Sequence, residues 1–120
     1  MQGGTEWLID AMGCRAATLA SLPHVRNLLA QVVADLRLTV LAELDHQFEA
    51  PPGITAMRLL AESHLALHTF PESGVCTLNL YCCSPRPAYD WRVVLEHHLG
   101  ASAVAVRHVE RGYAPDRISE

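Results

Sequence analysis

Two histidines, His64 and His68, are the first residues whose type and spacing suggest chemistry. On a helix, a spacing of four would place both imidazoles on one face, as in many zinc sites. The segment that carries them alternates like a strand, however, and four residues of strand separate two side chains by about 13 Å. One metal ion cannot span that distance, so we expect no metal site here. The ordinary interpretation of either histidine is a hydrogen-bonded residue at the edge of the core.

The cysteines are a second kind of reactive group. They lack the paired C-x-x-C spacing of metal and redox sites, so we expect free thiols in a reducing compartment. Adjacent residues of a strand point to opposite faces, so at most one of Cys82 and Cys83 can line a given site. The cysteines of the chain are Cys14, Cys76, Cys82 and Cys83.

The charge balance excludes several classes of function. Nine Lys+Arg against 13 Asp+Glu give a net charge of −4, which leaves no basic surface for nucleic acid or an anionic membrane. All nine basic residues are arginine, so a lysine Schiff base, a P-loop and a lysine-bound pyridoxal cofactor are excluded. The chain also has no run of about 20 apolar residues and no signal-peptide pattern, so we expect a cytoplasmic protein without a membrane span.

The elements that position these residues follow from the hydropathy pattern. A length of 120 residues, of which 50% are hydrophobic, predicts a single domain over residues 1–120. Helical and strand-like runs together predict an α+β fold, a two-layer α/β sandwich whose mostly antiparallel sheet carries two helices on one face. The expected strands are residues 6–12, 39–48, 54–61, 64–70, 75–83 and 103–109, and the expected helices are residues 22–38 and 90–99.

One segment carries a more specific signal than these patterns. It reads Glu62-Ser63-His64-Leu65-Ala66-Leu67-His68-Thr69-Phe70-Pro71-Glu72. This segment resembles the self-processing segment of the prokaryotic S-adenosylmethionine decarboxylases. The resemblance spans nearly the whole chain in the family's order. Its other matching segments are His46-Gln47-Phe48, Pro52-Gly53-Ile54-Thr55, Cys83, Asp90-Trp91 and Glu110-Arg111-Gly112.

The resemblance implies a cofactor made from the chain itself. A decarboxylase must delocalise the electron pair left when CO2 departs, and a carbonyl cofactor joined to the substrate amine as an iminium does so. By resemblance, Ser63 attacks the carbonyl of Glu62, the chain breaks between these two residues, and Ser63 becomes a pyruvoyl group. Family members are homodimers, so the resemblance also implies a homodimer of cleaved protomers.

The resemblance assigns roles to individual side chains. His68 matches the base that removes the α-proton of Ser63, and Thr55 matches the hydroxyl that stabilises the tetrahedral intermediate. Cys83 matches the acid that protonates the decarboxylated product. The implied substrate is S-adenosylmethionine, and the implied product is the aminopropyl donor for spermidine. The residues expected to bind the substrate are Phe48, Leu65, Phe70 and Glu72.

Several positions depart from the common family pattern. Thr55 stands where serine is usual, and Phe70 stands where tryptophan is frequent. Asn79 stands where aspartate is frequent, and Glu6 replaces the histidine of a Gly-x-His pattern. The loop that follows Phe48 is longer by one residue. The departures concern the identity of the substrate more than the formation of the cofactor.

Two alternatives therefore stay open. The first is a related pyruvoyl-dependent decarboxylase of ornithine or arginine, in which Glu6 or Glu49 would face the cationic side chain of the substrate. The second is a partner subunit that binds an active paralogue and never processes itself. The presence of Ser63, His68 and Cys83 argues against the second alternative, because an inactive subunit has no chemical need for all three.

Overall fold

The computed structural model of the protein describes residues 2–84 and 86–112. The expected strands and both expected helices are present, although the first helix ends at Asp35 rather than near residue 38. A further helix of four residues was not expected from the sequence. The elements are β1 (Gln2–Met12), α1 (Ala16–Leu19), α2 (Leu22–Asp35), β2 (Val40–Gln47), β3 (Ile54–Leu60), β4 (Ser63–Phe70), β5 (Val75–Cys82), α3 (Trp91–Leu99) and β6 (Ala103–Gly112).

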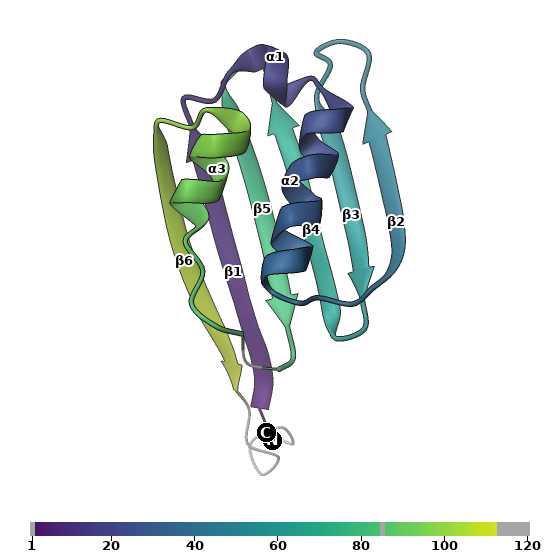
Figure 1. The fold of residues 1–120 in the computed structure, drawn as a ribbon, viewed down its shortest axis with the longest axis vertical. Helices are drawn as coiled ribbons and strands as arrows, with labels where there is room; N and C mark the ends of the chain where they lie inside the picture. The colour runs from purple at the N-terminus through teal and green to yellow at the C-terminus, as the bar shows by residue number, and fades with distance from the viewer. Residues whose placement is uncertain (1, 85, 113–120) are drawn as a thin grey trace, which may run out of the picture.

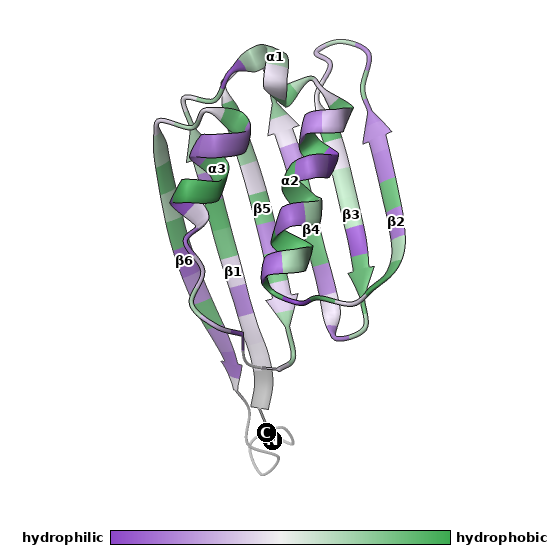
Figure 2. Ribbon diagram, in the orientation of Figure 1, coloured by the Kyte–Doolittle hydropathy of each residue, from purple (hydrophilic) through white to green (hydrophobic). Residues whose placement is uncertain are grey.

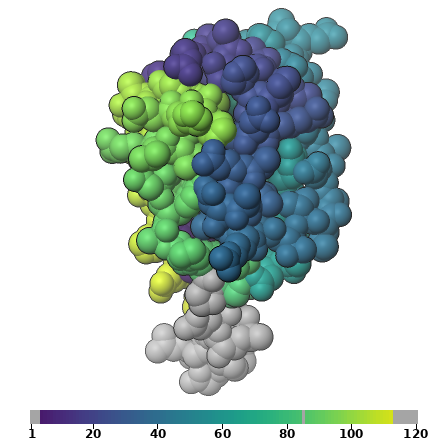
Figure 3. All heavy atoms as spheres, in the orientation of Figure 1, coloured from purple at the N-terminus to yellow at the C-terminus, as the bar shows by residue number. Residues whose placement is uncertain are grey.

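The strands form one six-stranded sheet in the order β2-β3-β4-β5-β1-β6. Every pair of neighbouring strands is antiparallel. The helices α2 and α3 lie on one face of this sheet, and α1 lies near its upper edge (Figure 1). In the space-filling view, α2 and α3 lie side by side over the middle of the sheet (Figure 3). The predicted α+β two-layer sandwich is thus confirmed.

Alternation along the strands decides which side chains enter the core. In β5, the residues Cys76 and Leu78 are buried, whereas Thr77 and Asn79, which alternate with them, are partly exposed. The strands accordingly carry alternating apolar and polar bands (Figure 2). The predicted alternation of β5 is confirmed. None of the four cysteines is joined to another in the structure, and Cys83 is the exposed one.

Local capping sets where the helices begin and end. Ser21 caps α2 by accepting a hydrogen bond from the backbone N–H of His24, and Asp90 caps α3 in the same way toward Val93. The helix α3 ends at Gly100, whose φ of 70° is left-handed and favours glycine. The sequence does not predict the helix α1, because four residues are too few to show a helical period.

A buried ion pair ties the edge strand β2 to its neighbours. Arg58 of β3 donates to Asp45 of β2 at 2.5 Å, and their side chains are only 4% and 9% exposed. Arg26 of α2 donates to the same carboxylate at 2.9 Å. Burial acts to raise the pKa of Asp45, but the hydrogen bonds from both arginines outweigh it and hold the pKa below its ordinary value.

The second face of the sheet carries no helix in residues 2–84 and 86–112 (Figure 1). On this face, Leu44 of β2 lies opposite Met57 of β3, and Leu59 follows on the same strand. Their side chains are 71%, 44% and 54% exposed. The sandwich therefore leaves apolar side chains uncovered on one side. No helix among the described residues is long and apolar enough to cross a membrane.

Candidate active site

The residues expected to act together fall into two groups at opposite ends of β4. Ser63 begins this strand and Phe70 ends it. The turn between β3 and β4 lies at the lower edge of the sheet, and the loop between β2 and β3 lies at the upper edge (Figure 1). At a rise of about 3.3 Å per residue, Ser63 and His68 of one chain lie about 16 Å apart. We call the two groups the hairpin end and the cavity end.

The hairpin end is built on a tight turn at the expected cleavage point. Leu60 of β3 pairs with Ser63 of β4, so only Ala61 and Glu62 form the turn. Ser63 has a φ of 145°, a region that residues with a side chain rarely adopt. Such a conformation costs free energy and is typical of functional sites. The peptide bond between Glu62 and Ser63 is therefore attached to a strained residue.

Cys83 reaches this turn through its backbone. Its N–H donates to the carbonyl oxygen of Glu62 at 3.1 Å, and its thiol is exposed. The neighbouring thiol of Cys82 faces the core, and burial raises its pKa. Gly4 lies beside both, because a Cβ at this position would come within 2.4 Å of the carbonyl oxygen of Cys82. Of the two adjacent cysteines, Cys83 is thus the one available for chemistry.

The cavity end contains the other expected catalytic pair. Thr55 of β3 lies directly opposite His68 of β4, and Thr55 Oγ1 is hydrogen-bonded to His68 Nδ1 at 2.9 Å. Both side chains line a cavity of about 240 Å³. Phe48, Phe70 and Glu72, three of the expected substrate-binding residues, line the same cavity. The fold therefore places an aromatic pair and a carboxylate around one imidazole.

Leu65 is the expected substrate-binding residue that the fold separates from this cavity. Its side chain is 0% exposed in the core beneath the helices. We call the face of the sheet that no described helix covers the open face. In the described chain, only the backbone of Leu65 is left for a contact with a ligand on this face. His64 lies on the open face one residue earlier, and both histidines lie on β4 as the alternation predicts.

A chain of polar side chains at the hairpin end was not found from the sequence. His64 Nε2 donates to Asn79 Oδ1 at 2.9 Å, and Asn79 Nδ2 donates to Glu6 Oε2 at 3.1 Å. Arg111 completes the chain through an ion pair with Glu6 at 2.5 Å. The hydrogen bonds from Asn79 and then from Arg111 hold the pKa of Glu6 below its ordinary value.

Two of the departures from the family pattern therefore contact each other. Glu6 lies on β1 and Asn79 on β5, and these strands are neighbours in the sheet. In this chain the carboxylate stands on β1 and faces an amide on β5. This contact depends on the pairing of β1 with β5, which the sequences of two distant segments do not reveal.

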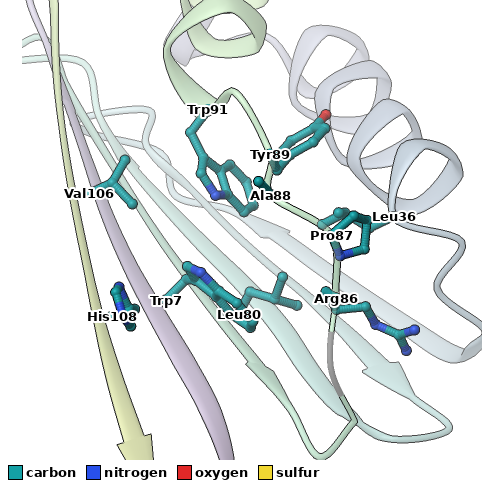
Figure 4. Close-up of a pocket in the computed structure, with 10 residues that line it drawn as sticks. All are labelled: Trp7, Leu36, Leu80, Arg86, Pro87, Ala88, Tyr89, Trp91, Val106 and His108. Atoms are coloured by element: carbon teal, nitrogen blue, oxygen red, sulfur yellow. The ribbon is translucent and has the colours of Figure 1, made fainter.

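A second cavity lies on the helix side of the sheet and is separate from these groups. It has a volume of about 210 Å³ and is lined by both tryptophans of the chain, Trp7 and Trp91. The side chain of Arg86 borders it, but its guanidinium points away from the two indole rings (Figure 4). Thr55 and His68 do not line it.

Comparison with known proteins identifies the family. The model of the S-adenosylmethionine decarboxylase family matches residues 5–112. The S-adenosylmethionine decarboxylase proenzyme of Aquifex aeolicus is 38% identical over 118 residues, which cover 98% of this chain and 87% of the relative. The proenzyme of Thermoplasma acidophilum is 33% identical over 110 residues, covering 91% of this chain and 83% of the relative.

The fold agrees with this similarity. The crystal structure of the adenosylmethionine decarboxylase from Aquifex aeolicus superposes with a TM-score of 0.79 at 31% identity. The superposition covers 95% of this chain and 94% of the other. Sequence and fold thus agree, and the chain belongs to the S-adenosylmethionine decarboxylase family.

Proposed function

We propose that this protein cleaves itself between Glu62 and Ser63 and then decarboxylates S-adenosylmethionine. The observation that carries the proposal is the strained turn, in which Ser63 has a φ of 145° and the carbonyl of Glu62 is held by the N–H of Cys83. Membership of the family and the proenzyme names of the relatives support it.

Cleavage requires a sequence of bond changes at this turn. Ser63 Oγ attacks the carbonyl carbon of Glu62, the amide C–N bond breaks, and an ester forms. The N–H of Cys83 stabilises the negative oxygen of the tetrahedral stage, because it already donates to that atom. A base then removes the α-proton of Ser63, and the Cβ–Oγ bond breaks to release the carboxylate of Glu62. Water converts the remaining dehydroalanine to a pyruvoyl group and ammonia.

The base for that proton must come from a second copy of the chain. His68 is hydrogen-bonded to Thr55 but lies about 16 Å along β4 from Ser63 of its own chain. A general base has to come within hydrogen-bond reach of the proton it removes. If two open sheet faces pack together about a twofold axis, the cavity end of one copy meets the hairpin end of the other. Each dimer then contains two complete sites.

The uncovered face of the sheet supports this homodimer. Leu44, Met57 and Leu59 are exposed apolar residues on the face that no helix covers. A soluble domain loses stability by leaving such a surface in water, and a second copy of the same face would cover it. The proposal places the substrate between the two sheets, where both ends can contact it.

The residues of the hairpin end fit a pyruvoyl group made from Ser63. The turn holds position 63 at the end of a strand with the exposed Cys83 beside it. Such a group supplies an electrophilic carbonyl that can accept the electron pair left by CO2. The thiol of Cys83 then donates a proton to the product. At the cavity end, Phe48 and Phe70 would stack on adenine, and Glu72 would bind the ribose hydroxyls.

The contacts of Glu6 argue against one of the two carboxylates expected to face a basic amino acid. Glu6 is already bound by Arg111 and Asn79, so it is not free to bind a cationic substrate side chain. Comparing turnover of S-adenosylmethionine, ornithine and arginine by the purified enzyme tests this preference. Faster decarboxylation of either amino acid would overturn the choice of substrate but leave the cleavage intact.

Intact-mass measurement tests the cleavage itself. We expect the purified protein to separate into residues 1–62 and 63–120, with residue 63 lighter than serine as a pyruvoyl group requires. The Ser63→Ala variant should stay as one chain of 13.2 kDa without activity. Ser73→Ala, in the next turn along the chain, is the matched control and should cleave normally. A freshly made protein that remains in one piece would contradict the proposal.

A further inference from the structure

A polar pocket lies beside the cleavage point, separate from the aromatic cavity and from the cavity end. Its volume is about 230 Å³. Among the described residues, two arginines line it, and Glu62 is its one acidic residue. It is lined by Arg37, Thr39, Leu60, Ala61, Glu62 and Arg86.

Arg86 lines this pocket and has one donor without a hydrogen-bond partner among the described residues. Its Nη2 makes an ion pair with Glu62 Oε1 at 2.5 Å. Its Nε is buried and has no hydrogen-bond partner among residues 2–84 and 86–112. A buried donor without an acceptor is costly, so this atom favours an added acceptor. The guanidinium also points away from the aromatic cavity of Trp7 and Trp91 (Figure 4).

Arg37 faces the same pocket from an unusual backbone position. It follows α2 with a φ of 54°, in the left-handed region that favours glycine. The N–H of Arg37 donates to the carbonyl oxygen of Ala34, and the N–H of Leu38 donates to the carbonyl oxygen of Val33. Arg37 therefore occupies the position after a helix end that glycine usually fills. Within the described chain, its guanidinium makes no ion pair or side-chain hydrogen bond.

Cleavage would create a ligand of the right charge at this place. The carbonyl of Glu62 is neutral in the intact chain and becomes a terminal carboxylate when the ester to Ser63 is eliminated. Glu62 then carries two negative charges beside two guanidinium groups. An arginine fork binds a carboxylate through charge-assisted hydrogen bonds, and Arg86 retains an unused donor for a second one.

We propose that the pocket between Arg37 and Arg86 binds the terminal carboxylate that self-cleavage creates at Glu62. The inference rests on the proposed cleavage between Glu62 and Ser63. In the intact chain, the Glu62 carbonyl is held by the N–H of Cys83. Movement of the new carboxylate into the pocket withdraws Glu62 from Cys83 and opens space for substrate beside residue 63. The pocket thus acts after the bond has broken.

The bound carboxylate would also join the two fragments. Glu62 ends the N-terminal fragment and Arg86 belongs to the C-terminal fragment. The ion pair between the Glu62 side chain and Arg86 therefore crosses the cleavage point, and a contact of the new terminal carboxylate with Arg86 would cross it as well. Arg37 belongs to the N-terminal fragment and would hold its own new end against the sheet. The pocket therefore stabilises the cleaved protein more than the intact chain.

Thermal unfolding of cleaved and uncleavable protein tests this difference. Arg37→Met should leave the Tm of the uncleavable Ser63→Ala chain unchanged but lower the Tm of the cleaved protein by about 4 °C. Raising the salt concentration should shrink this loss, because screening weakens the ion pairs. Arg92→Met is the matched control, since Arg92 is exposed on α3 and lines no part of the pocket. Equal shifts in both backgrounds would overturn the inference.

A second measurement follows the new end directly. Carboxypeptidase should trim fragment 1–62 slowly in the cleaved protein and several-fold faster when Arg37→Met or Arg86→Met is present. Equal trimming rates would overturn the inference, and so would a failure of Arg37→Met to cleave, because the pocket is proposed to act only after cleavage. If the unsubstituted protein does not cleave, the proposed function fails instead, and intact mass distinguishes the two results.

Discussion

Cys83 contacts the proposed cleavage point through its backbone, while its side chain is free for another step. The N–H of Cys83 donates to the carbonyl oxygen of Glu62, and the exposed thiol is not part of that hydrogen bond. A substitution that keeps the backbone should therefore separate cleavage from turnover. This separation makes the role of a single residue measurable.

We expect Cys83→Ala to cleave at nearly the normal rate, because alanine supplies the same backbone donor. Decarboxylation should fall at least about 100-fold or give a product protonated at the wrong carbon, as expected when a general acid is removed. Intact mass follows the first reaction, and CO2 release with product analysis follows the second. Cys14→Ala, which removes a buried thiol far along the chain, is the control. Unchanged turnover in the Cys83 variant would exclude the thiol as the proton donor.

At the scale of elements, the pairing of strands explains features that the sequence could not reveal. Alternation predicts which side of β4 and β5 enters the core, since apolar burial requires a period of two. It does not predict that Glu6 contacts Asn79, because this contact depends on β1 pairing with β5. The four-residue helix α1 is missed because it is shorter than the period that would identify it.

The buried ion pair between β2 and β3 gives the fold a defined dependence on pH. Because the pKa of Asp45 is lowered in the folded state, its contribution to stability is complete above the pKa of the unfolded carboxyl, about 3.9. The contribution is lost as the pH falls through the lower pKa of the folded state. Asp45→Asn in the Ser63→Ala chain should therefore reduce the free energy of unfolding at about pH 6 but have less effect at about pH 2.

Urea unfolding at both pH values checks this expectation. Arg58→Met should cost about 1–3 kcal/mol near neutral pH, because it removes one buried donor of Asp45 while Arg26 still pairs with that carboxylate. Arg107→Met removes an exposed ion pair at 3.3 Å with Asp10 and should cost less than about 1 kcal/mol. A loss from Asp45→Asn that is equal at both pH values would mean that the ion pair does not stabilise the fold.

At the scale of the whole molecule, residues of one motif lie at distant places. The segment from Glu62 to Glu72 looks like one site in the sequence, but β4 carries its two ends to opposite edges of the sheet (Figure 1). The fold class and the cavity-lining residues Phe48, Phe70 and Glu72 follow from sequence and resemblance. The proposal that a second copy completes the site rests on the length of an extended strand.

Mixing two inactive chains tests whether the site is shared. His68→Ala and Ser63→Ala should each fail to cleave alone. When they are co-expressed, the His68→Ala chain should cleave, because the Ser63→Ala partner supplies an intact His68 to its Ser63. Mass spectrometry distinguishes the two chains, and Leu44→Glu on the open face of both should abolish the rescue by preventing assembly. Absence of rescue in a co-purified mixed dimer would mean that each chain uses its own base.

The aromatic cavity on the helix side has an optical consequence. Trp7 would belong to the N-terminal fragment and Trp91 to the C-terminal one, yet both line the same hollow (Figure 4). These are the only tryptophans of the chain, so after the proposed cleavage all indole emission would arise where the two fragments meet. Their intrinsic fluorescence would therefore report, without an added label, whether the two fragments stay together.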